Sequence, residues 1–224
     1  MNRFVLLILF LVVIVSSGPA PEASTKKEEQ KVLMISSTCN VDAGLTSKIE
    51  EHVSYNLGTK FRRGKCVDFD TEVFDNIAKA AFKSMEPQDF YGLVLYDLPT
   101  NIVNVTIYTI TNRLAVINLE RLRRGTPPLN DDDERFIRRV KKESMRALGT
   151  LIGVPKCPTY TCAMYTHGED PDSLDKKGYN FCPPHRIGSD KTLIEAGLDV
   201  KKVVDQAIEL HERERQKEAE SDKP

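Results

Sequence analysis

The sequence has no large excess of charge of either sign. Its 224 residues include 32 lysines and arginines against 33 aspartates and glutamates, so the formal net charge is −1. A near-neutral chain gives no electrostatic reason to expect nucleic acid or an anionic membrane surface as a partner. The chain also lacks an internal repeat, and 40% of its residues are apolar and 29% charged. This composition argues against extensive disorder, collagen, a coiled coil and a multi-span membrane protein, and favours one main domain.

Long apolar runs are absent, except near the N-terminus. There, Phe4 to Val15 is unbroken but only 12 residues long, whereas a membrane-spanning helix needs about 20. Arg3 precedes the run and small residues follow it, which is typical of a secretory signal peptide. We therefore expect residues 1–20 to be a signal peptide, with an uncleaved anchor as the alternative. The predicted location is secreted, extracellular or in the lumen of the secretory pathway, without other membrane contact.

The rest of the chain divides by composition and hydrophobic periodicity. Polar residues 21–30 are a leader, 31–210 the main domain, and 211–224 a charged, flexible tail. Buried strands alternate with amphipathic helices in the first half, which predicts an α/β (α+β) fold around a mixed sheet. The expected strands are 31–36, 61–69, 91–96, 103–109 and 114–119, and the helices are 45–57 and 70–82. A long helix capped by Asn130 should follow, then a loop-rich segment 153–188, then a C-terminal helix beginning near Ser189.

The cysteines fall into an early pair and a late group. Cys157-x4-Cys162 and Cys182-x2-His185 form two close ligand pairs, which is the spacing of a tetrahedral zinc site. A Cys3His set has no open coordination position, so such a zinc would be structural. The alternative is a disulfide among the late cysteines, which an extracellular compartment permits.

Two further modification sites depend on the compartment. Cys39 and Cys66 have no metal-like neighbours, so they form either a disulfide or two buried thiols. Asn104-Val-Thr is a sequon for N-glycosylation in a secreted chain.

The segment from Arg146 to His185 resembles the archaemetzincin signature. That family's pattern is H-E-x-x-H-x-x-G-x-x-H-C-x4-C-x-M-x17-C-x-x-C. The glycine, three cysteines and Met-turn methionine of the pattern match in register, and His185 stands at the final cysteine; the matching residues are Gly153, Cys157, Cys162, Met164 and Cys182. The resemblance covers roughly residues 31–187. It implies a metzincin-like mixed sheet with packed helices, a long active-site helix, a Met-turn and a zinc knot, here residues 153–188.

Four positions depart from the pattern. Where the family has three zinc-binding histidines and a general-base glutamate, this sequence has Arg146, Ala147, Thr150 and Lys156. We call these the catalytic-motif positions. Arginine stays protonated and cannot bind zinc, and alanine cannot accept a proton. The resemblance therefore implies that no catalytic zinc binds and that the four residues have no catalytic role. We expect Arg146 and Lys156 to fill the former metal position and to pair with a carboxylate, with Glu143 as the partner of Arg146.

These observations together predict a secreted, catalytically inactive archaemetzincin-like pseudopeptidase. It would hold one structural Zn²⁺ and bind an unknown peptide or protein as a monomer. One alternative is a zinc metallopeptidase-like enzyme with non-standard active-site residues. The other is a structural or interaction protein that uses its C-terminal helix.

Overall fold

The computed structural model of the protein describes residues 31–68, 74–85, 89–97, 104–109, 113–124, 130, 133–166 and 171–200. The predicted signal peptide 1–20, leader 21–30 and tail 211–224 lie outside these residues. In the part of the chain that the structure describes, none of the helices combines the length and apolar character that crossing a membrane requires.

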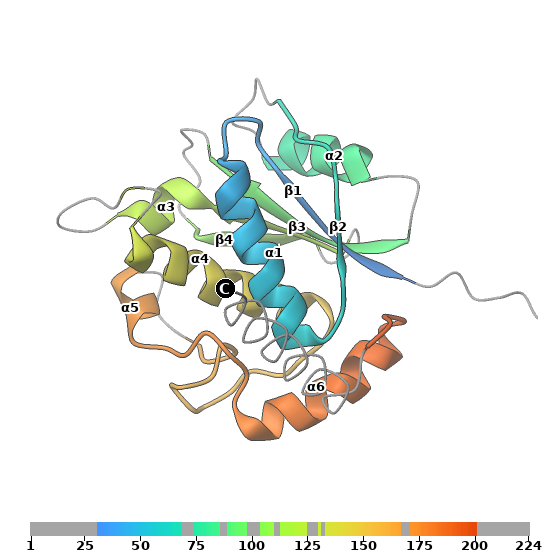
Figure 1. The fold of residues 1–224 in the computed structure, drawn as a ribbon, viewed down its shortest axis with the longest axis vertical. Coiled ribbons are helices and arrows are strands. Elements are labelled where there is room, and N and C mark those ends of the chain that lie inside the picture. Colours follow the sequence, from blue (N-terminus) through green and yellow to red (C-terminus); the bar gives the residue numbers. More distant parts are fainter. Residues whose placement is uncertain are drawn as a thin grey trace, which may run out of the picture.

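A five-stranded mixed sheet forms the centre of the fold (Figure 1). The strand order is β2-β1-β3-β5-β4, with only β4 antiparallel to its neighbour β5. The strands are β1 (Val32–Ser37), β2 (Phe61–Arg63), β3 (Phe90–Tyr96), β4 (Thr106–Thr109) and β5 (Leu114–Asn118). The predicted α/β class with a mixed sheet is therefore confirmed.

Both faces of the central strands are buried, which explains their continuous apolar sequences. Along β3, Leu93 packs into the larger core and Val94 into the smaller one on the opposite face. The larger core contains residues of α1 (Ala43–Leu57) and α4 (Glu134–Leu151), and the smaller one residues of α2 (Phe74–Met85). The sheet thus lies between α1 and α4 on one face and α2 on the other (Figure 1).

The remaining helices are α3 (Leu119–Arg123), α5 (Pro171–Asp175) and α6 (Pro183–Glu195). Two predicted helix starts are wrong. Asp133, not Asn130, caps α4, because its carboxylate accepts a hydrogen bond from the Arg135 amide at 2.7 Å. Helix α6 begins at Pro183 rather than near Ser189, because prolines at the first helical positions support a helix start instead of preventing it. The segment 153–188 is consequently less irregular than predicted.

Candidate metal centre

The structure brings together the four late residues that were predicted as zinc ligands. The Sγ atoms of Cys157, Cys162 and Cys182 and a ring nitrogen of His185 all lie within 4.8 Å of one another. The three cysteines are buried and form no disulfide, and His185 is half-buried. Among the described residues, no second group of three or more cysteine, histidine or acidic side chains is arranged to hold a metal ion.

Each ligand pair is held by its local backbone. The loop from Cys157 to Tyr165 closes on itself, because the Cys157 amide donates to the Met164 carbonyl at 3.1 Å. Cys182 caps α6, which places His185 on the first turn of the helix. The His185 Nδ1 therefore lies 3.2 Å from the Cys182 Sγ. The start of the helix thus brings the two side chains of the Cys-x2-His pair together.

The distances and donor types fit zinc. The Sγ atoms of Cys157 and Cys182 are 3.7 Å apart, far longer than a disulfide bond of about 2.05 Å. Two thiolates on one tetrahedral zinc are separated by about 3.8 Å. A zinc ion would be held by the three thiolates and the imidazole, and it would supply a fixed crosslink between the loop and α6.

The thiols differ in how readily they lose their protons. Burial raises the pKa of Cys162 to about 11. Burial would also raise the pKa of Cys157, but the hydrogen bond that its sulfur accepts from the Thr159 amide and the neighbouring thiols lower it below the ordinary value. Because zinc binds thiolates, metal binding here must release protons.

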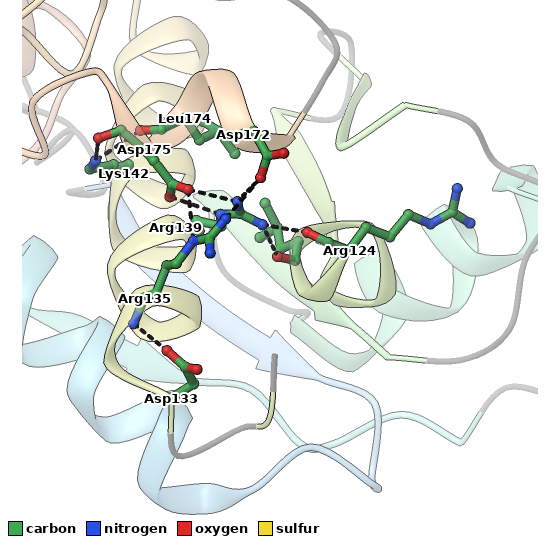
Figure 2. A network of polar contacts seen from close by, with 9 residues as sticks. Arg124, Asp133, Arg135, Arg139, Lys142, Asp172, Leu174 and Asp175 are labelled. Atoms are coloured by element: carbon green, nitrogen blue, oxygen red, sulfur yellow. Dashed lines mark hydrogen bonds and ion pairs between the residues drawn. The ribbon is translucent and has the colours of Figure 1, made fainter. Parts of the chain in front are cut away.

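Helix α5, which lies between the two ligand pairs in the sequence, is fixed to α4 by a polar network (Figure 2). The fully buried Arg139 of α4 donates to the Asp175 carboxylate at 2.9 and 2.7 Å and to Asp172 at 2.5 Å. The Lys142 ammonium donates to the carbonyls of Leu174 and Asp175 at 2.8 and 3.0 Å. Burial lowers the pKa of Lys142. The zinc knot is therefore anchored to the long helix by charges as well as by apolar contacts.

The Met-turn residue packs directly against α4. A Cβ built on Gly149 would lie 2.5 Å from the Met164 Sδ and 3.3 Å from the ring of Phe181. Met164 and Phe181 are both buried in the larger core. A glycine at position 149 thus allows the long helix to approach the Met-turn closely.

Beside this contact, Arg146 forms the centre of a buried ion-pair cluster. Its guanidinium binds the Glu143 carboxylate side-on, with Nε 3.0 and 3.2 Å from the two oxygens and Nη2 bonded to Oε1. Glu143 is fully buried and also accepts a hydrogen bond from the Thr106 hydroxyl of β4. The fully buried Lys177 Nζ lies 3.9 Å from the same carboxylate and donates to the Ala163 carbonyl at 3.0 Å. The structure thus contains the expected ion pair between Arg146 and Glu143.

The other catalytic-motif positions do not converge with Arg146. Ala147 is buried in the larger core, and the Thr150 hydroxyl donates to the Arg146 carbonyl within α4 at 2.9 Å. Lys156 is exposed, and the carboxylate partner expected for it is not found among the described residues. It follows Pro155 in the irregular segment that begins after α4 ends at Leu151.

The pKa values in the cluster follow from burial and charge. Burial lowers the pKa of Lys177 to about 8, although Glu143 opposes this shift. Burial raises the pKa of Tyr108, whose ring centroid lies 5.9 Å from the Arg146 guanidinium carbon, to about 12. At neutral pH Lys177 is therefore mostly protonated and Tyr108 is neutral.

Comparison with known proteins links this site to one family. Residues 94–186, from β3 to the first turn of α6, match the model of peptidase family M54. The archaemetzincin of Thermococcus kodakarensis is 31% identical over 94 residues, which are 41% of this chain and 50% of that protein. The predicted resemblance to archaemetzincins is confirmed. The sequence match spans about half the length of this curated relative.

Solved archaemetzincin structures show the same fold. The archaemetzincin from Methanopyrus kandleri superposes with a TM-score of 0.56 at 21% identity, over 76% of this chain and 99% of that one. A zinc-dependent peptidase from Methanocorpusculum labreanum gives 0.56 at 22% identity, over 70% and 99%. The archaemetzincin from Archaeoglobus fulgidus, solved in complex with malonate, gives 0.52 at 15% identity, over 71% and 99%. The archaemetzincin-like architecture thus extends well beyond the segment with sequence similarity.

Two further predicted sites involve residues outside the candidate metal centre. Cys39 and Cys66 are joined by a disulfide that links the segment after β1 to the segment after β2. Asn104 is exposed and precedes β4 by two residues. His167, the remaining histidine near the Met-turn, lies outside the described residues.

Sequence reasoning missed the residues that surround Glu143. Thr106 and Lys177 were not expected near it, and neither was the network around Arg139. The sequence around Lys177 does not indicate which residue of a distant helix the lysine will contact.

Proposed function

We propose that this protein is a catalytically inactive archaemetzincin-like pseudopeptidase that keeps the structural zinc and binds peptides or proteins. The observation that carries the proposal is the side-on ion pair between Arg146 and Glu143. It places a permanent cation where the family pattern has its first zinc-binding histidine. The positive charge of Arg146 repels a metal ion at that point. Position 147 is an alanine, so it offers no carboxylate to activate water.

The binding role is supported by the edge of the sheet. Strand β4 pairs only with β5 within the described sheet, so its other edge can accept an extended peptide. Thr106 and Tyr108 of this strand contact the Arg146 cluster. We propose that the surface formed by Arg146 and the free edge of β4 is used for binding without cleavage, after secretion of the chain.

Hydrolysis of peptides by the zinc-loaded full chain tests the inactive state. We expect no cleavage of fluorogenic aminopeptidase substrates or of denatured protein, even with added zinc. A variant carrying Arg146→His, Ala147→Glu, Thr150→His and Lys156→His should gain a second bound zinc. A matched variant with the three histidines but Ala147 retained should bind this zinc without cleaving peptides. Hydrolysis by the natural chain that Arg146→Met abolishes would overturn the proposal.

A second candidate function is favoured by one observation. Helix α6 exposes two large apolar side chains seven residues apart, Ile187 and Ile194, which are 79% and 62% accessible. They lie on the same side of the helix. If a partner binds through α6 and not through the surface beside Arg146, Ile187→Ser should weaken its capture and Arg146→Met should not.

A further inference from the structure

The Arg146 cluster holds more positive than negative charge. Arg146 and Lys177 both pair with Glu143, and among the described residues no other carboxylate pairs with either cation. Within these three side chains, positive charges outnumber negative ones by one when both basic groups are protonated. An anionic ligand would add a second counter-charge to the mostly buried guanidinium of Arg146.

One edge of the Arg146 guanidinium is available to such a ligand. Nε and Nη2 are used by Glu143, whereas Nη1 makes no hydrogen bond with any group of the described residues. The side chain is 25% exposed, so it is reachable from solvent but mostly shielded. Nη1 and the second hydrogen of Nη2 form a parallel pair of donors that matches the two oxygens of a carboxylate.

The surroundings restrict the ligand further. The ring of Tyr108 lies beside the guanidinium and belongs to the edge strand β4. A ligand bound to Arg146 would therefore lie next to the strand edge that can pair with an extended peptide. These features favour a planar carboxylate carried by a peptide.

We propose that Arg146 is the centre of a carboxylate-binding site, formed with the β4 edge, for an acidic group of a bound peptide. This inference rests on the proposed binding role and specifies its ligand. The carboxylate is either a peptide C-terminus or an acidic side chain. In both cases the Arg146 guanidinium would bind the carboxylate without a metal ion.

Titration of the isotope-labelled, zinc-loaded full chain tests the proposal. N-acetyl-alanyl-alanine offers a terminal carboxylate, N-acetyl-aspartyl methylamide offers a side-chain carboxylate, and N-acetyl-alanyl-alaninamide offers neither. We expect saturable shifts of the Arg146 Nε–H signal and of β4 amide signals with at least one of the acidic probes. The neutral amide should cause none. The acidic probe that binds more tightly identifies the source of the carboxylate.

Variants separate this site from general attraction to positive charge. Arg146→Met should weaken the acidic probe about tenfold or more, because a charge-assisted hydrogen-bond pair is lost. Arg146→Lys keeps the charge and should restore only part of the affinity. Arg138→Met removes an exposed arginine of the same helix, 55% accessible, and should change nothing. Melting curves and far-ultraviolet circular dichroism of each variant confirm that it is folded.

Several results would overturn the proposal. These are the absence of saturable shifts in the natural chain, equal shifts with the neutral probe, and shifts that map away from Arg146. Zinc content and peptide hydrolysis are measured on the same samples. A chain with one zinc and no hydrolysis that ignores the acidic probes would contradict only the carboxylate site. A second zinc together with hydrolysis would contradict the proposed function itself.

Discussion

The zinc knot and the catalytic-motif positions lie next to each other, but they differ in how their residues are arranged. In the knot, four ligand atoms from one loop and the start of α6 meet within 4.8 Å. At the catalytic-motif positions, Arg146 pairs with Glu143, Ala147 fills the core and Lys156 is exposed. The described residues thus form a metal-binding arrangement in the knot. At the catalytic-motif positions they form an ion pair and part of the apolar core.

The largest expected effect comes from breaking the knot. Cys157→Ser or Cys182→Ser should remove the metal and the stability linked to it, about 4 kcal/mol when free zinc exceeds its Kd a thousandfold. Denaturant unfolding with and without a chelator measures this difference. The matched control is the Cys39→Ser, Cys66→Ser double variant, which should retain zinc. If the chelator leaves the unfolding midpoint of the natural chain unchanged, the knot does not depend on metal.

Glu143→Gln should be the most damaging change in the ion-pair cluster. It leaves Arg146 and Lys177 without a counter-charge, and breaking such a buried pair costs about 3–5 kcal/mol. The control is Glu134→Gln, also on α4 but 87% exposed, which should stay within about 0.5 kcal/mol. Equal losses of unfolding free energy in the two variants would mean that the cluster does not stabilise this region.

Two glycines allow the knot and the helix to be compared directly. At Gly178 a Cβ would lie 1.7 Å from the Thr161 carbonyl oxygen, so the backbone must move. Gly178→Ala should cost about 3 kcal/mol of unfolding free energy and weaken zinc binding. At Gly149 the clash is with the flexible end of Met164, so Gly149→Ala should cost about 1 kcal/mol. A reversed order of the two losses would contradict the described packing of the knot.

The smallest effect concerns the contact between α1 and the knot. His52 of α1 lies 3.3 Å from the Tyr179 carbonyl, and burial, together with the charge of Lys141, lowers its pKa below 6.5. The unfolded chain therefore binds a proton first as the pH falls below 6.5, so stability decreases there. The melting temperature of the natural chain should fall relative to that of His52→Gln as the pH decreases below 6.5, because only histidine gains a proton there. Parallel curves across this range would mean that His52 has the same pKa in both states.

The sequence predicted those features that depend on local patterns. Apolar runs identified β1, β3 and β5, since central parallel strands are buried on both faces. The spacing of the late cysteines and His185 indicated which side chains would gather. The start of α6 was misplaced because the same two prolines are compatible with a turn and with a first helical turn.

Features that depend on long-range packing could not be predicted in this way. Lys177 reaches Glu143 only because the knot folds back over α4, and the sequence gives no distance between them. The outward position of Lys156 likewise depends on the path of the chain after α4. An ion pair within one helix, such as that of Glu143 and Arg146, was predictable because residues three apart are neighbours.

The number of zinc ions bound per chain tests the central claim most directly. It should be measured by elemental analysis of protein from a secreting host, without added metal, for the natural chain and two variants. We predict one zinc in the natural chain, one in Arg146→Met and none in Cys182→Ser. Two zinc ions in the natural chain, or one that survives Cys182→Ser, would contradict the account of a structural metal site beside a catalytic site without metal.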